Sequence, residues 1–128
     1  MRLLLDTHAF IWWANDPQRL SPTALQVCQD PANALVLSVV SLWEMQIKMG
    51  AGKIDLRRPL PEILRSQQET NGLTILAIEA SHALGLGGLP AIHKDPFDRM
   101  LVAQAIAEGL PIVSGDSMVR KYPATVIW

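Results

Sequence analysis

Short apolar runs alternate along the chain with longer segments that carry helix signals. The first run, Leu3–Leu5, is dense and brief, as in a strand that is buried on both faces of a sheet. Further strands are predicted at residues 34–38, 73–77, 111–114 and 125–127, the last at an edge. Helices are predicted at residues 8–14, 22–30, 41–49, 61–70, 79–84 and 96–108. This alternation predicts an α/β fold with a central parallel sheet of four to five strands, flanked by helices on both faces.

Polar residues at the expected positions predict where several helices begin. Ser21 followed by Pro22 is typical of a helix N-terminus, with serine as the cap and proline in the first turn. Asp95 is expected to cap the helix that follows it for the same reason. Ser41 is predicted to cap the third helix, and the spacing from Ser41 to Glu44 matches a capping box.

Length and composition limit the classes of protein to which this chain can belong. Its 128 residues fit a single domain, residues 1–128, and the formal net charge of −1 excludes a polycation that coats nucleic acid. The one cysteine, Cys28, has no partner for an internal disulfide, and Asp6 ends the first apolar run too early for a signal peptide. No segment is apolar enough for a membrane span, so we expect a soluble, cytoplasmic protein.

The apolar content predicts a protein partner. Apolar residues make up 49% of the chain, which is high for a small soluble domain. We therefore expect a groove for a partner helix, formed partly by Trp12 and Trp13 and partly by the helices near residues 22–49.

Four acidic residues stand where solvated acids are not expected. Asp6 directly follows the first strand, and Asp116 follows the strand at 111–114 after one glycine. Glu44 lies between two apolar residues, and Asp98 precedes an apolar helical stretch. Because residues beyond the carboxyl ends of parallel strands face the ligand crevice, all four can converge at one edge of the sheet. Clustered carboxylates repel one another, and a divalent cation with oxygen ligands, Mg²⁺ or Mn²⁺, would supply the missing charge.

Each of these acids also has a purely structural interpretation. Asp6 can cap the helix that follows it, Glu44 can complete the capping box, and Asp98 suits the positive end of a helix dipole. Asp116 can initiate a turn. Taken together in this fold, however, the four acids favour the metal interpretation. Asp95 is better explained as a helix cap, with a supporting role beside the metal as the alternative.

Histidines and basic residues give weaker indications. His8, His82 and His93 have no zinc-site spacing. We expect His82 to be structural, whereas His8 and His93 lie near the acids and can contact substrate. The basic residues form two candidate phosphate tracks, and their alternative interpretation is a solvated surface. One track comprises Lys48, Lys53, Arg57 and Arg58, and the other comprises Lys94, Arg99, Arg120 and Lys121.

The segments LLLDTHAFIWW, SLWEMQIK, HKDPFDRMLVAQA and IVSGD resemble the PIN-domain family, particularly its VapC-type toxins. The resemblance extends over essentially the whole chain. It implies that Asp6, Glu44, Asp98 and Asp116 are the catalytic acids. Ser114 matches a supporting hydroxyl residue two places before the last acid, where the family often has threonine.

The resemblance also implies an activity and its partners. The family comparison implies a Mg²⁺- or Mn²⁺-dependent endoribonuclease that cleaves single-stranded RNA, a small VapB-like antitoxin as partner, and a homodimer. The metal would be held by Asp6, Asp98 and Asp116, and would lower the pKa of a bound water and neutralise the phosphate. Glu44 would orient that water or bind a second ion. Lys48, Arg99 and Lys94 are the predicted contacts to the substrate.

Other functions remain open on the sequence alone. A PIN-like module that binds RNA or protein without cutting would have lost one or more acids, and this chain retains all four. A phosphatase with a nucleophilic aspartate usually has a second aspartate two residues after the first, where this chain has His8. A DNase is a third alternative, because the same metal chemistry cleaves either polymer.

Overall fold

The computed structural model describes residues 1–128 and contains one five-stranded sheet in the order β3-β2-β1-β4-β5. Every pair of neighbouring strands is parallel, and Leu3 and Leu5 of β1 lie opposite Leu35 and Leu37 of β2. The predicted α/β fold is therefore confirmed, including the edge position of the last strand. The strands are β1 (Arg2–Leu5), β2 (Ala34–Ser38), β3 (Thr74–Leu76), β4 (Ile112–Val113) and β5 (Val126–Ile127).

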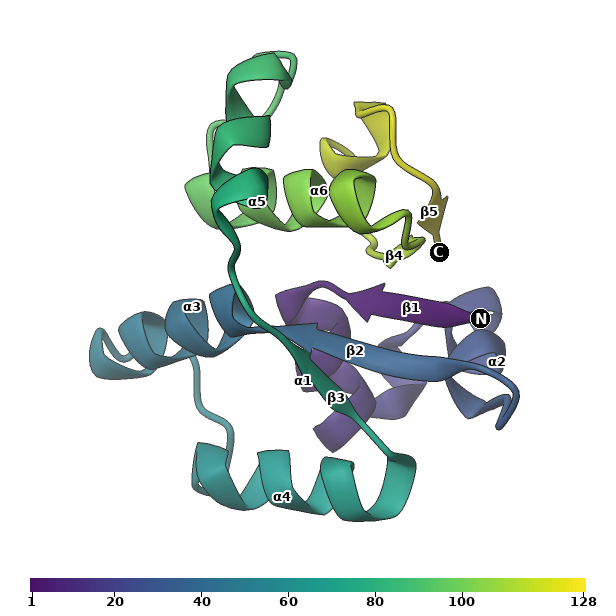
Figure 1. The fold of residues 1–128 in the computed structure, drawn as a ribbon. Coiled ribbons are helices and arrows are strands. Elements are labelled where there is room, and N and C mark those ends of the chain that lie inside the picture. The colour runs from purple at the N-terminus through teal and green to yellow at the C-terminus, as the bar shows by residue number, and fades with distance from the viewer.

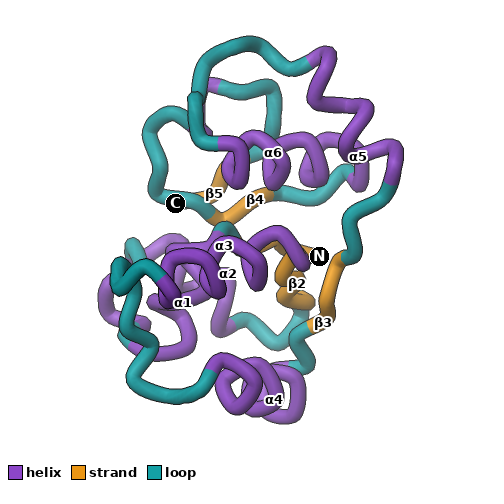
Figure 2. The backbone as a smooth tube through the Cα atoms, turned by 90° about the vertical axis from the view of Figure 1, so that its left-hand side faces the viewer, coloured by secondary structure: helices purple, strands orange, loops and turns teal.

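Helices cover both faces of the sheet, as predicted. Helices α5 and α6 lie on one side of the strands, and α1, α2 and α4 lie on the other (Figures 1 and 2). Short 3₁₀ turns occupy Pro17–Arg19, Leu86–Gly88 and Val119–Lys121. The α-helices are α1 (Thr7–Asn15), α2 (Pro22–Gln29), α3 (Val39–Gly50), α4 (Leu60–Asn71), α5 (Ala80–Gly85) and α6 (Pro96–Glu108).

The alternation of side chains along β1 divides the core into two parts. Leu3 and Leu5 belong to an apolar cluster with α1, α2 and α4, whereas Leu4 belongs to a second cluster with α6. All three leucines are fully buried, which explains why the strand is apolar at successive positions rather than at alternate ones. Cys28 is an unpaired thiol buried in the first cluster, and burial raises its pKa to about 11, so it is a packing residue.

The start of α3 differs from the sequence prediction. The helix begins at Val39 and its N-cap is Ser38, whose hydroxyl accepts a hydrogen bond from the backbone N–H of Val40. Ser41, the predicted cap, lies inside the helix and is fully buried. The capping box through Glu44 is also wrong, because that carboxylate pairs with Thr7 and Lys48 instead. Strand β2 runs into α3 without a loop, so the only serine at the boundary is the last residue of the strand.

The path of the chain creates a crevice beside the first strand. The chain places β2 and β3 on one side of β1 and then returns to place β4 and β5 on its other side. Loops that follow β1 and β4 therefore diverge at their carboxyl ends, which is where open α/β sheets bind ligands. Asp6 and Ser114 are the first residues beyond these two strands.

An apolar hollow of the protein overlaps only in part with the groove that the sequence predicted. Trp12 and Trp13 are partly buried against the first core cluster. A hollow of about 360 Å³ lies instead between α3 and α6, where Trp43 packs edge-on against Phe97. Only its α3 residues, Val40 and Trp43, fall within the predicted range. None of the helices has the length and apolar character that crossing a membrane requires.

Candidate active site

The four predicted acids converge on one open hollow of about 400 Å³ at the carboxyl ends of β1 and β4. They come from four separate segments, which are the end of β1, helix α3, helix α6 and the loop after β4. Almost every residue around the hollow is polar or charged. It is lined by Asp6, His8, Trp12, Glu44, Lys48, His93, Asp95, Asp98, Gly115 and Asp116.

Asp6 is both a helix cap and a site residue. Its Oδ1 accepts the backbone N–H of Ala9 at 2.7 Å, which starts α1, and its carboxylate is only 5% exposed. Burial raises the pKa of Asp6, although the Ser114 hydroxyl and the Ala9 N–H both favour its charged form. The structural and functional interpretations of this residue are therefore compatible, since the carboxylate that begins the helix also lines the hollow.

Glu44 is held from both sides by polar partners. The Thr7 hydroxyl lies 2.6 Å from its Oε1, and the Lys48 ammonium, one helical turn further along α3, pairs with its Oε2. Thr7 also lies 2.9 Å from the Ser41 hydroxyl, so α1 and α3 are joined at this point. Burial disfavours the charge of Lys48, but the hydrogen bond and charge of Glu44 outweigh it and raise the pKa of the lysine. The ion pair fixes the orientation of the buried carboxylate.

Asp95 and Asp98 have different roles at the start of α6. Asp95 is the N-cap, as predicted, and its Oδ1 accepts the backbone N–H groups of Phe97 and Asp98 at 2.8 and 3.2 Å. Asp98 points toward the hollow and meets the other acids there. Burial, followed by the charges of Asp95, Asp6 and Glu44, raises the pKa of Asp98 to about 7. At neutral pH the metal-free fold therefore does not fully stabilise the negative charge of this carboxyl.

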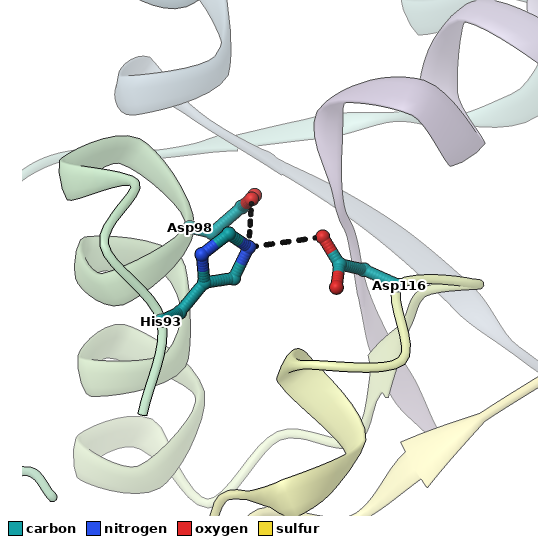
Figure 3. Close-up of side chains that lie close together, drawn as sticks. All are labelled: His93, Asp98 and Asp116. Carbon is teal, nitrogen blue, oxygen red and sulfur yellow. Dashed lines mark hydrogen bonds and ion pairs between the residues drawn. The ribbon is translucent and has the colours of Figure 1, made fainter. Parts of the chain in front are cut away.

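His93 lies between two of the acids (Figure 3). Its Nε2 is 3.0 Å from Oδ2 of Asp98 and 3.0 Å from Oδ2 of Asp116. Burial disfavours the charged imidazole, but the hydrogen bond to Asp116 and the charge of Asp98 raise its pKa. Burial likewise disfavours the charge of Asp116, whose pKa is lowered by His93 and by the N–H of Met118.

The glycine before Asp116 is required by a close contact. A Cβ at Gly115 would lie 2.7 Å from the indole of Trp128, well inside van der Waals contact. That indole also packs against Trp12, with ring centroids 5.8 Å apart. Of these two rings, Trp12 lines the hollow.

The donor chemistry of the hollow fits a divalent cation. Its oxygen donors come from five acidic side chains, whereas the basic groups of the lining are Lys48, His8 and His93. The raised pKa values of Asp6 and Asp98 express the resulting excess of negative charge. Carboxylate oxygens suit hard cations such as Mg²⁺ and Mn²⁺. Asp6, Asp98 and Asp116 are the residues best placed to hold one, and potential ligand atoms of Asp98, Asp116 and His93 lie within 4.8 Å of one another.

A model of the PIN-domain family matches residues 3–124 of this chain. The chain belongs to the PIN-domain family. The ribonuclease VapC22 of Mycobacterium tuberculosis is 33% identical to it, over 97% of each chain. Solved PIN-like structures share the fold at low sequence identity. A VapBC2 structure from Rickettsia felis, bound to a promoter DNA fragment, has a TM-score of 0.71 at 18% identity, covering 98% of this chain and 97% of its own. A toxin–antitoxin complex from Klebsiella pneumoniae has a TM-score of 0.61 at 19% identity, covering 98% and 96%.

The predicted supporting and substrate-binding residues of this PIN domain lie in different environments. Ser114 is fully buried and its hydroxyl accepts the backbone N–H of Asp116 at 3.1 Å. Lys48 lines the hollow. Lys94 is exposed outside it, and the Arg99 guanidinium is occupied by Pro90 and Tyr122. The substrate contacts of these three basic residues stay predictions.

Two residues that shape the site were not predicted from the sequence. The Thr7 hydroxyl contacts residues 34 and 37 positions away, and only the packing of α1 against α3 brings them together. The Tyr122 hydroxyl reaches the backbone of His93, 29 positions away. Neither Thr7 nor Tyr122 belongs to a short sequence motif that is associated with a known chemical role. A signal was present only for Thr7, which directly follows Asp6 and precedes a helix.

Proposed function

We propose that this PIN-domain protein is an endoribonuclease that cleaves single-stranded RNA with the help of Mg²⁺ or Mn²⁺. One observation carries the proposal, namely that Asp6, Glu44, Asp98 and Asp116 come from four separate segments and line the same hollow. The name of the M. tuberculosis relative supports RNA as the substrate. The oxygen donors and the raised pKa of Asp98 support a divalent cation.

The residues of the hollow divide the chemistry among them. Asp6, Asp98 and Asp116 would hold the cation, which when bound would supply positive charge to activate a water and to neutralise the phosphate oxygens. Glu44 would orient the attacking water, since Thr7 and Lys48 fix its carboxylate against rotation. Ser114 would keep the loop of Asp116 in place through the backbone N–H of that residue.

Basic residues around the hollow would bind the RNA backbone. Lys48 is the strongest candidate because its ammonium lines the hollow and is already oriented by Glu44. Lys94 and Arg99 flank the start of α6, and we assign them weaker contacts to phosphates further along the strand. Trp12, which lines the hollow and packs against Trp128, would allow a base to stack there.

Cleavage of a labelled single-stranded RNA tests the proposal. The wild-type protein should cut it with Mg²⁺ or Mn²⁺ and should stop when EDTA is added. Asp6→Asn and Asp98→Asn should abolish cleavage while circular dichroism shows an intact fold, because the amide keeps the shape but not the charge that a cation needs. Full metal-dependent activity of a folded Asp6→Asn protein would overturn the assignment of that ligand.

The same assay separates the alternative functions. Binding of RNA without cleavage under any metal would favour a non-catalytic PIN-like module. Faster cleavage of single-stranded DNA of the same sequence would favour a DNase, since the metal chemistry is common to both polymers. Each of these results would overturn the proposed substrate or the proposed reaction.

We further propose that the protein is the toxin of a toxin–antitoxin pair, acting in the cytoplasm on cellular RNA. Two solved structures with this fold are those of VapBC2 and of a toxin–antitoxin complex. This likeness supports a small VapB-like antitoxin as partner. A short neighbouring reading frame that encodes a DNA-binding protein should be present. Its product should co-purify with this chain and inhibit the cleavage of RNA. Homodimerisation is part of the same proposal, and sedimentation of the purified protein should give twice the mass of the chain.

A further inference from the structure

The imidazole of His93 stands at the centre of the acidic hollow. Its Nε2 is 3.0 Å from a carboxylate oxygen of Asp98 and equally far from one of Asp116 (Figure 3). These distances permit two interpretations, since a metal ligand and a hydrogen-bond donor would both lie near the two acids. The hydrogen bond made by the other ring nitrogen decides between them.

The Nδ1 atom of His93 accepts a hydrogen bond from the backbone N–H of Asp95 at 3.2 Å. A backbone N–H can only donate, so in the neutral ring Nδ1 carries no proton. The proton of the neutral ring is then on Nε2, which donates to Oδ2 of Asp116 and lies 3.0 Å from Oδ2 of Asp98. A nitrogen that bears a proton has no lone pair for a cation. His93 is therefore a hydrogen-bond donor to Asp116 that also lies against Asp98, and not a metal ligand beside them.

The ring is held in this orientation by contacts outside the hollow. The backbone N–H of His93 donates to the Tyr122 hydroxyl at 2.7 Å, and Tyr122 is buried. The Arg99 guanidinium donates to the same hydroxyl at 3.1 Å and to the carbonyl of Pro90 at 2.9 Å. This network joins the loop before α6 to the last 3₁₀ turn, so the position of the imidazole is set by the fold.

We propose that His93 is a positioning residue whose Nε2–H holds Asp116 beside Asp98 in the arrangement that receives the cation. The proposal rests on the proposed function, because it assumes that these two acids bind the metal. Asp116 is also fixed through its Oδ1, which accepts the N–H of Met118 at 2.7 Å. The Asp98 side chain makes no hydrogen bond, and its one ion pair is the 3.0 Å contact with His93 Nε2, so the imidazole is the group that links the two carboxylates. Hydrogen-bonded partners of metal ligands typically change metal affinity about 10- to 100-fold.

Mn²⁺ binding to the purified protein, followed by titration calorimetry, tests the proposal without any need for RNA. His93→Leu removes the donor and should weaken Mn²⁺ binding about 10- to 100-fold. His93→Gln should recover most of the affinity, since its side-chain amide places an N–H near the position of Nε2. Equal or tighter Mn²⁺ binding by His93→Leu would overturn the proposal.

Pulsed electron paramagnetic resonance of the Mn²⁺-loaded wild-type protein separates a donor from a ligand. No nitrogen coupling from a directly bound imidazole should be seen. A strong nitrogen coupling that disappears in His93→Gln would show that the residue is a ligand, and the proposal would fail. Tyr122→Phe provides a second route if His93→Leu does not fold. It releases the backbone of His93 and should weaken Mn²⁺ binding by a smaller factor.

Cleavage kinetics then distinguish this inference from the proposed function. The Mn²⁺ concentration for half-maximal cleavage should rise in His93→Leu by the same factor as the dissociation constant, while KM for RNA at saturating Mn²⁺ stays near the wild-type value. A wild-type protein that binds Mn²⁺ but cuts no RNA contradicts the proposed function and leaves the affinity measurements to decide the role of His93. A wild-type protein that binds no Mn²⁺ contradicts both.

Discussion

Asp95 and Asp98 show how two identical side chains in one helical turn acquire opposite energetic roles. Asp95 accepts two backbone N–H groups that the helix leaves unpaired, so its carboxylate stabilises the start of α6. Asp98 caps nothing and faces the other acids, and burial and their charges raise its pKa to about 7. Its carboxylate is therefore retained at a cost in stability, as expected of a residue kept for its chemistry.

We predict that substitutions at these two positions change metal-free stability in opposite directions. Asp98→Asn removes a repelled charge, so its melting temperature in EDTA should equal or exceed that of the wild type. Asp95→Ala removes the cap and should lower the free energy of unfolding by about 1 kcal/mol. Thermal melts of both variants at neutral pH check this. A clear loss of stability in Asp98→Asn would mean that this acid is a structural residue of the helix.

At the scale of elements, α3 is tied to its neighbours by a buried polar network. The Ser38 hydroxyl caps the helix and donates to Oε1 of Gln104 on α6 at 2.5 Å. The Gln104 amide continues to the carbonyl of Ala77 and to His82, which pairs with Glu108. His82 is fully buried in this network, away from the hollow, which places it in a structural role. The network sets how α6, and with it Asp98, lies against the sheet.

Ser38→Ala should destabilise the protein more than Ser41→Ala. The first variant removes a helix cap and leaves the buried side-chain carbonyl oxygen of Gln104 without its hydrogen bond, at a cost of about 1–3 kcal/mol. The second variant removes one of the two hydrogen-bond partners of the Thr7 hydroxyl, and the other partner, Glu44, remains. Urea denaturation of the two alanine variants gives the comparison. A larger effect at Ser41 would mean that the contact between α1 and α3 matters more than the cap.

At the scale of the whole molecule, the strand order determines where negative charge accumulates. The return of the chain across β1 opens a crevice between β1 and β4, and the loops and helices around it bring the acids together. The sheet and its two apolar clusters must stabilise the fold against this repulsion. The overall net charge of −1 does not reveal this local excess of negative charge, because it sums the whole chain. The acids of the hollow lie together at one edge of the sheet.

The metal-free protein should become more stable on mild acidification. Asp98 has a pKa of about 7 in the folded protein and 3.8 when unperturbed, so between these values the folded protein holds a proton that the unfolded chain has lost. Stability therefore falls as pH rises through this window. The raised pKa values of Asp6 and His93 act in the same direction, and the lowered pKa of Asp116 acts only at more acidic pH. Melting temperatures in EDTA should rise from about pH 7.5 to about pH 5, and a fall would contradict the charge cluster.

Added Mn²⁺ or Mg²⁺ should offset the stability that the metal-free protein loses at neutral pH. A cation that binds only the folded state stabilises it by about 2.7 kcal/mol at a hundredfold excess over its dissociation constant. Melts at neutral pH with EDTA and with Mn²⁺ should differ by several degrees in the wild type. Asp98→Asn should show little of this shift because it lacks one ligand. The absence of any metal-dependent shift in the wild type would count against a metal site in the hollow.

The sequence by itself determined the order of the elements, the class of fold and the four acids. Apolar runs such as Leu3–Leu5 and caps such as Asp95 depend on neighbours within a few residues, and local spacing reveals them. The sequence also indicated Asp6, Glu44, Asp98 and Asp116. An acid directly after a buried strand or within an apolar stretch is not expected if its only role is packing. The resemblance to the PIN-domain family then gave these positions a common purpose.

Tertiary structure alone decided what each side chain contacts. Ser41 and Glu44 match a capping box in the sequence. In the folded protein, however, packing of α3 against α1 places both side chains in contact with the Thr7 hydroxyl, 34 and 37 residues away. The place of His93 between two acids depends on the return of the chain across the sheet, which brings Asp116 to it from 23 residues away. Spacing along the chain encodes local geometry, whereas such contacts depend on strand order and helix packing, which arise only when the whole chain has folded.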